Sequence, residues 1–226
     1  MQKGDECMSE IGMKMWIGMM AVSMLFAVSI LLQGGSVIRG RMEQKVGWRR
    51  LAVYVLPIAP ALTALLLMTG SDAPAVIKSV ILCSFLPMVA VIDRREMIIP
   101  NRLLLLMLGY WILASAVHML AMGTLDTEYL VNALTGGLIG ASPLLVRLIS
   151  KGGIGMGDIK LFAVVGLYVG KEDILRAMFF SLVLALIVLL GKRIRKQIGR
   201  KDQVSFGPYV AVGTMLMVFM NIPLLG

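Results

Sequence analysis

Long stretches of apolar residues without a charge constrain the fold of this 226-residue chain more than any other feature of its sequence. The hydrocarbon core of a membrane, about 30 Å thick, is crossed by about 20 apolar residues in a helix, which satisfies its own backbone groups. Hydrophobic residues make up 58% of the chain and charged residues 15%, which leaves too little polar surface for a water-soluble enzyme. The apolar stretches are 15–32, 51–69, 73–92, 103–125, 129–146, 159–170, 174–191 and 203–226.

These stretches predict an all-α, polytopic membrane protein with about eight transmembrane helices, of which the sixth, 159–170, is unusually short. Two stretches carry one charge each near an end, Lys78 and Arg176, where a long side chain can reach the interface. We expect the whole chain, 1–226, to form a single integral-membrane domain.

The net charge of +9 would suit a nucleic-acid-binding protein, but the basic residues follow the loops between the predicted helices. Sixteen of the 22 Lys and Arg residues lie in one alternate set of loops, 33–50, 93–102, 147–158 and 192–202, whereas the other set is rich in Asp and Glu. Because basic loops stay in the cytoplasm, the pattern predicts a multi-pass protein of the plasma membrane with these loops inside. It argues against nucleic acid as a partner and indicates contact with anionic membrane lipids.

The cysteine and histidine residues argue against a metal site. Cys7 and Cys83 lack the spacing of a zinc or redox motif, and the single histidine, His118, excludes a histidine-based cluster. We therefore expect neither a metal nor another cofactor. We expect His118, near the outer end of the fourth stretch, to make a structural hydrogen bond.

Two pairs of glycines are spaced four residues apart, Gly136 with Gly140 and Gly166 with Gly170. This spacing allows two helices to pack closely in a membrane. We expect that packing within the chain rather than between two copies, and the sequence does not indicate an oligomeric state.

Two aspartates, Asp93 and Asp158, stand out because most of the 13 acidic residues lie in the outer loops. Asp93 ends the third apolar stretch, where an interfacial ion pair with Arg94 or Arg95 is the simpler interpretation. Asp158 could likewise be an ordinary helix cap. A cap does not explain the four glycines in 152–157, which allow another backbone to come close.

The short sixth stretch predicts that Asp158 lies below the cytoplasmic surface of the membrane. The twelve steps from Asp158 to Gly170 span about 18 Å at about 1.5 Å per residue, well short of the core of about 30 Å. An ionisable group at that depth must line a polar cavity or find a partner. We expect the loop 152–157 to enter a water-filled pocket on the side where Asp93 emerges.

A pair of carboxyl groups in such a pocket has a known chemistry. Two carboxyl groups about 3 Å apart share one proton and titrate as a unit. One takes a proton from water while the other, protonated, polarises a carbonyl oxygen. Asp93 and Asp158 would then perform aspartic peptidase chemistry, which needs no metal.

At these residues the sequence resembles the bacterial type IV prepilin peptidases, leader peptidases of the GxGD class of membrane aspartyl proteases. The stretch GMGDIKL at 155–161 is similar to the signature G-x-G-D-x-K-(L/F) of that family. The segment from Asp93 to the Ile-Pro-Asn at 99–101 is similar to its motif D-x5-I-P-(D/N), and the Phe-Gly-Pro at 206–208 to its motif before the last helix. The resemblance covers about 51–220.

The resemblance implies that Asp93 and Asp158 are the catalytic pair of an aspartic endopeptidase. Its substrates would be type IV prepilin or pseudopilin precursors, cleaved at the cytoplasmic face after the Gly that ends a short basic leader. The other motif residues would shape the site or bind substrate: Pro100, Asn101, Gly155, Gly157, Lys160, Phe206, Gly207 and Pro208. For Lys160, an ammonium group that reaches the interface is the ordinary alternative.

One feature departs from the pattern of the family. Many members insert a cytoplasmic domain with paired C-x-x-C motifs between the first two spans and also methylate the new N-terminus of the substrate. Here the corresponding loop, 33–50, is short and has no cysteine. We therefore expect no structural zinc and no N-methyltransferase activity.

Two other functions are compatible with a polytopic membrane protein that carries aspartates. An ion- or proton-coupled transporter would use intramembrane aspartates, but it leaves the Ile-Pro-Asn segment at 99–101 unexplained. A non-catalytic scaffold of a secretion system leaves both intact aspartates unexplained. The sequence does not identify the pilin or the secretion system that is served.

Overall fold

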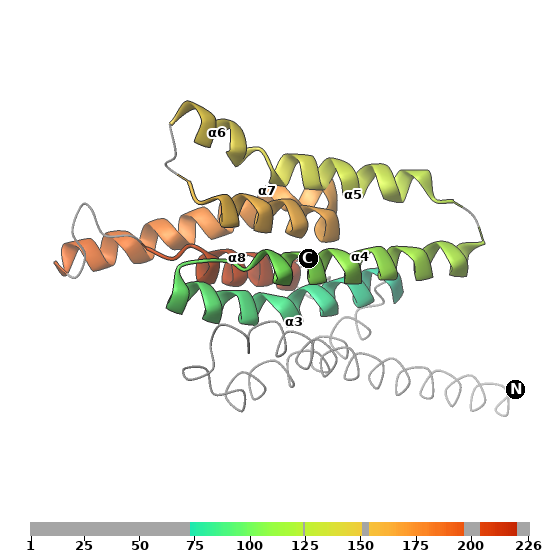
Figure 1. Ribbon diagram of the computed structural model, residues 1–226, viewed down its shortest axis with the longest axis horizontal. Coiled ribbons are helices and arrows are strands. Elements are labelled where there is room, and N and C mark those ends of the chain that lie inside the picture. The colour runs from blue at the N-terminus through green and yellow to red at the C-terminus, as the bar shows by residue number, and fades with distance from the viewer. Residues whose placement is uncertain (1–72, 124, 151–153, 197–203, 221–226) are drawn as a thin grey trace, which may run out of the picture. The chain divides into compact units, whose positions relative to one another are not determined.

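The computed structural model describes residues 73–123, 125–150, 154–196 and 204–220, and within these ranges it contains helices and no strand (Figure 1). The helices are α3 (Ala73–Glu96), α4 (Asn101–Met122), α5 (Thr127–Gly140), α6 (Pro143–Ile149), α7 (Met156–Ile194) and α8 (Gly207–Met220). The predicted spans 15–32 and 51–69 lie outside the described residues.

Four helical segments are long and apolar enough to cross a membrane: α3, α4, the consecutive pair α5 and α6, and α7. The apolar α8 is shorter, with 14 residues. In the described part of the chain, the prediction of an all-helical, multi-pass membrane protein is therefore confirmed. The count of eight spans stays a prediction.

The chain divides into two compact units, and the boundary between them in the sequence follows Ser84, within α3. The second unit, Phe85–Gly226, contains the C-terminal half of α3 and all of the helices that follow. Both predicted catalytic aspartates belong to this second unit. The prediction that 1–226 forms one domain stays a prediction.

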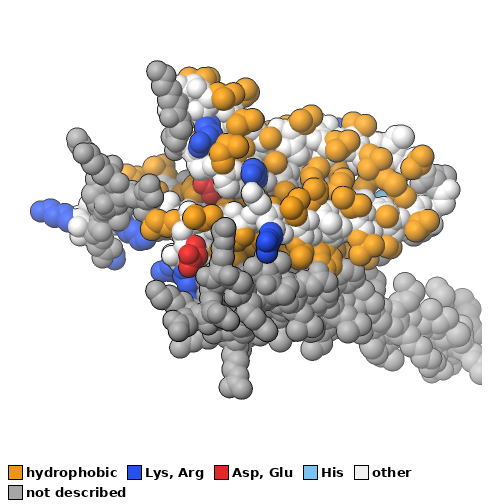
Figure 2. Space-filling view, in the orientation of Figure 1, with side chains coloured by type: hydrophobic (Ala, Val, Ile, Leu, Met, Phe, Trp, Pro, Cys, Tyr) orange, Lys and Arg blue, Asp and Glu red, His pale blue; other side chains and the backbone are white. Residues whose placement is uncertain are grey.

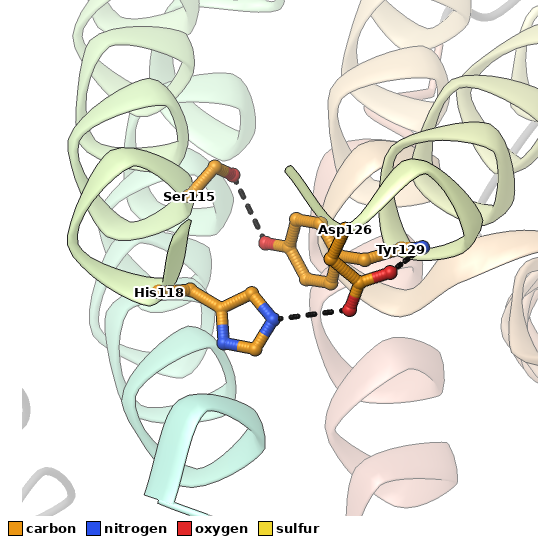
Figure 3. A network of polar contacts seen from close by, with 4 residues as sticks. All are labelled: Ser115, His118, Asp126 and Tyr129. Atoms are coloured by element: carbon orange, nitrogen blue, oxygen red, sulfur yellow. Dashed lines mark hydrogen bonds and ion pairs between the residues drawn. The ribbon is translucent and has the colours of Figure 1, made fainter. Parts of the chain in front are cut away.

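Polar contacts hold the connection between α4 and α5 (Figure 3). Asp126 caps α5, since its Oδ1 accepts a hydrogen bond from the Tyr129 N–H at 2.9 Å, and this bond lowers the pKa of Asp126. The Asp126 Oδ2 lies 3.4 Å from Nε2 of His118, and the hydroxyl groups of Ser115 and Tyr129 share a hydrogen bond of 2.9 Å. The structural hydrogen bond predicted for His118 is confirmed.

Glycines allow α5 and α7 to pack closely. A methyl group on Gly136 would lie 2.6 Å from the carbonyl carbon of Gly170, and one on Gly166 would overlap the carbonyl oxygen of Gly136. A methyl group on Gly140 would likewise overlap the carbonyl oxygen of Phe162. These contacts join two helices of one chain, which confirms the interpretation of the glycine pairs as an internal packing seam.

The helix α7 reverses direction at Gly170, whose φ of 84° is left-handed and favours glycine. Both ends of α7 consequently lie on the left of Figure 1. The Asn132 side chain of α5 stabilises the reversal, because its Oδ1 accepts a hydrogen bond from the N–H of Lys171 at 3.0 Å. The sequence pattern ends the sixth apolar stretch at 170 and begins the seventh at 174, and the structure places the reversal between them at Gly170, with helical residues again from Lys171. The first arm, 156–169, corresponds to the short sixth span.

Candidate active site

One end of the second unit brings together the segments that carry the three sequence motifs. The C-terminus of α3 and the N-termini of α4, α7 and α8 all lie toward the left of Figure 1, opposite the connection between α4 and α5. Figure 2 shows most basic side chains of the described residues toward this same side, whereas hydrophobic side chains cover the length of the helices. The candidate site is therefore at the polar end of an apolar bundle.

Asp93 lies in the last turn of α3 and is buried, with 4% of its surface exposed. Its Oδ2 accepts a hydrogen bond of 2.7 Å from the N–H of Gly207, the first residue of α8, and the N–H of Phe206 also donates to the carboxyl group. The free N–H groups at a helix N-terminus suit an anionic partner. The partners of Asp93 thus include the backbone of α8. The simpler interpretation from the sequence, an ion pair with Arg94 or Arg95, does not include this partner.

The segment 206–208 is built to receive that carboxyl group. A methyl group on Gly207 would lie 2.8 Å from both Cβ and Oδ2 of Asp93, so only a glycine lets the backbone of α8 approach the Asp93 side chain this closely. Pro208 stands in the first turn of α8, where its missing N–H costs no helical hydrogen bond. The predicted role of 206–208 in shaping the site or binding substrate stays a prediction.

Asp158 lies in the first turn of α7, which begins at Met156 with Gly155 as its N-cap residue. Asp158 is therefore not the cap, because the helix starts earlier than the sequence pattern suggested. The carboxyl group turns back toward Gly155, where a methyl group would lie 2.8 Å from its Oδ2. Asp158 is partly buried, and the charge of Asp93 acts on it. The two carboxyl groups are within electrostatic range of each other.

The second glycine of the GxGD stretch has a different neighbour. A methyl group on Gly157 would lie 3.2 Å from Cβ of Ile99, which is buried. Ile99 directly precedes Pro100, the N-cap residue of α4, whose φ of −65° and ψ of 128° hold the chain extended before the helix. The glycine thus lets the first turn of α7 pack against the Ile-Pro-Asn segment.

A polar contact joins the same two segments. Nζ of Lys160 donates a hydrogen bond to Oδ1 of Asn101 at 3.0 Å, and both side chains are exposed. The ammonium group of Lys160 therefore bonds to Asn101 of the Ile-Pro-Asn motif. The alternative from the sequence was that this group reaches the membrane interface.

Three residues outside the predicted set support the site. The ring of Phe162, one turn after Asp158, packs against that of Phe206 with their centroids 6.0 Å apart. The Arg147 guanidinium of α6 donates a hydrogen bond to the carbonyl group of Ile154, directly before Gly155. No sequence signal separated Arg147 from the other basic loop residues. Phe162 and Ile154, in contrast, flank the GxGD stretch and could have been suspected.

The described geometry joins the first motif, 93–101, to each of the other two, through Asp93 with Gly207, Ile99 with Gly157, and Asn101 with Lys160. Among the residues that the structure describes, no three His, Cys, Asp or Glu side chains gather as metal ligands. The prediction of a site without a metal or another cofactor stays a prediction. An electrostatically coupled pair of carboxyl groups at the polar end of a helical bundle is suited to activate water.

Comparison with known proteins agrees with this arrangement. Residues 80–190 match the family model described as type IV leader peptidase family, and this range includes Asp93 and Asp158. The chain is 32% identical over 143 residues to a prepilin leader peptidase/N-methyltransferase of Bacillus subtilis (strain 168), covering 61% of this chain and 53% of the relative. It is 28% identical over 150 residues to the protein of the same name from Pectobacterium carotovorum subsp. carotovorum, covering 63% and 51%.

The chain thus spans about half the length of these curated relatives. No solved structure matches it significantly. The names of both relatives include N-methyltransferase activity, and the prediction that this chain lacks that activity stays a prediction.

Proposed function

Because residues 80–190 match the type IV leader peptidase family, we propose that this chain is an aspartic endopeptidase that removes the leader from prepilin or pseudopilin precursors. The observation that carries the proposal is the set of contacts that joins the segments of Asp93 and Asp158, since Gly157 packs against Ile99 and Lys160 bonds to Asn101. The names of its relatives support the substrate class.

The proposed reaction uses the two carboxyl groups as a unit. One carboxylate takes a proton from a water molecule, and the oxygen of that water attacks the carbonyl carbon of the scissile peptide bond. The other carboxyl group, protonated, donates its proton to the carbonyl oxygen. The C–N bond of the tetrahedral intermediate then breaks as the leaving amine takes a proton from the first group, and a hydroxyl group of the intermediate returns a proton to the second group. We do not divide the two roles between Asp93 and Asp158, because a coupled pair titrates as one system.

The site is proposed to face the cytoplasm from the plasma membrane and to cleave after the Gly that ends the leader. The basic residues around it support this orientation, since Arg94, Arg95 and Arg102 are exposed at the same end. Anionic lipid head groups would then surround the mouth of the site.

Co-expression with candidate pilin precursors tests the proposal. The parent protein should shorten a precursor, and Asp93→Asn and Asp158→Asn should each abolish cleavage while the protein stays in the membrane. Asp173→Asn is the matched control, because Asp173 is an acidic residue of α7 whose side chain pairs with Arg176. Normal processing by either variant of the pair would refute the proposal. Ion transport by the purified protein in liposomes, lost in the same two variants, would favour the transporter instead.

A further inference from the structure

The hydrogen bond between Lys160 and Asn101 connects the two segments that carry the aspartates. Lys160 stands two residues after Asp158 in α7, and Asn101 begins α4 eight residues after Asp93. The bond of 3.0 Å thereby bridges 59 residues of sequence. Its two side chains are exposed, so it adds little to the burial of the core.

A second contact lies beside this bond on the same face of α7. Gly157 and Lys160 are three residues apart in a helix and are therefore neighbours on its surface. Gly157 packs against Ile99, while Lys160 bonds to Asn101, two residues further along. The first turn of α7 is consequently fixed at two points to one short segment, 99–101.

Two contacts with the segment 99–101 restrict a rotation of the first turn of α7 that a single contact would allow. The apolar contact at Gly157 limits how near α7 can come to α4, but it lets the first turn rotate about the helix axis. The directional hydrogen bond at Lys160 opposes that rotation. Asp158 belongs to the same turn, so the direction of its side chain follows from both contacts.

We propose that Asn101 and Lys160 form a positioning pair, whose hydrogen bond fixes the rotation of the first turn of α7 and so aligns Asp158 with Asp93 for hydrolysis. The inference rests on the proposed function, because it assigns a role within the same site. Neither residue is catalytic in this scheme, since both act through the orientation of Asp158.

The experiment measures kcat and KM of the purified protein on a precursor for Lys160→Met, Asn101→Ala and the double variant. Each single change should lower kcat about tenfold, because small misplacements of reacting groups are costly, while KM changes less than about twofold. The double variant should be no slower than the worse single variant, because all three lack the same bond. Asn101→Asp keeps an oxygen acceptor and should stay within about threefold of the parent kcat.

Arg102→Met is the matched control, since it removes a neighbouring exposed positive charge and should leave kcat unchanged. Losses that multiply in the double variant would overturn the pairing, and so would an Asn101→Asp variant as slow as Asn101→Ala. A raised KM at constant kcat in Lys160→Met would show that Lys160 binds substrate instead.

These outcomes differ from failure of the proposed function, which is an inactive parent or an active Asp93→Asn or Asp158→Asn variant. The melting temperatures of the parent, Lys160→Met, Asn101→Ala and the double variant test the hydrogen bond without any substrate. Decreases that are not additive support the pair, and additive decreases refute it.

Discussion

Substitution of Gly140 by Ala tests whether the packing of α5 against α7 holds the candidate site in place. The added Cβ would lie 2.8 Å from the carbonyl carbon of Phe162, whereas ordinary contacts of a Cβ begin at about 3.4 Å. The two helices must therefore separate locally by at least about 0.6 Å, the difference between these distances, because the carbonyl oxygen of Phe162 lies closer still. The obstacle is backbone, so no change of side-chain rotamer can remove it.

The expected losses of stability and of cleavage rate in Gly140→Ala follow from this displacement. Overpacking of a tight contact costs about 1–3 kcal/mol of stability, so the melting temperature should fall. Phe162 lies one turn after Asp158 in the same arm of α7, and the displacement therefore reaches the carboxyl group. Because a misplacement of about 1 Å can cost about a hundredfold in rate, a shift of about 0.6 Å should slow precursor cleavage about tenfold.

Two other glycines provide a graded control. Ala at Gly137 would meet the flexible end of the Leu167 side chain at 2.9 Å and should have a smaller effect. Ala at Gly109 would meet nothing within 4 Å and should leave the melting temperature and the cleavage rate unchanged. Thermal unfolding and precursor cleavage are measured on all three variants. A Gly140→Ala protein as stable and as active as Gly109→Ala would contradict the packing described for α5 and α7.

Two further predictions concern the two ends of the bundle. Gly207→Ala should reduce cleavage at least about tenfold, since its Cβ would lie 2.8 Å from the Asp93 side chain, and an unchanged rate would show that Asp93 does not depend on this contact. Asp126→Ala should lower the melting temperature near neutral pH by removing the cap of α5. The pKa of Asp126 is lowered chiefly by the Tyr129 N–H, so the stabilisation by the ionised cap is complete above the unfolded pKa of about 3.9 and disappears as the pH falls through the lower folded value. A difference in melting temperature that persists unchanged to pH of about 2 would contradict this assignment.

The helices and the packing seam were predictable because their causes are local. Lipid forces an uncharged stretch such as 103–125 into a helix, and α4 occupies Asn101–Met122. The spacing of Gly136 and Gly140 likewise shows which face of a helix can approach a neighbour. The family motifs indicated which residues to expect at the site, although the catalytic roles of Asp93 and Asp158 stay a proposal.

The contacts that assemble the site were not predictable, because they join residues that no local pattern relates. Nothing near Asp93 indicates that its hydrogen-bond donor is the N–H of Gly207, which belongs to another helix. In the sequence, Asn132 is a polar residue in an apolar stretch and nothing marks it as special. In the structure, its Oδ1 accepts a hydrogen bond from the N–H of Lys171, directly after the reversal of α7 at Gly170. Such contacts depend on the three-dimensional course of the chain.

The dependence of Asp93 on α8 has a consequence for biosynthesis. The donor N–H of Gly207 is added 114 residues after Asp93, so a nascent chain that already contains Asp93 lacks this donor until those residues have been synthesised. During membrane insertion the carboxyl group must find other solvation until α8 arrives beside it. The proposed site therefore stays incomplete until α8 has been synthesised and packs beside α3.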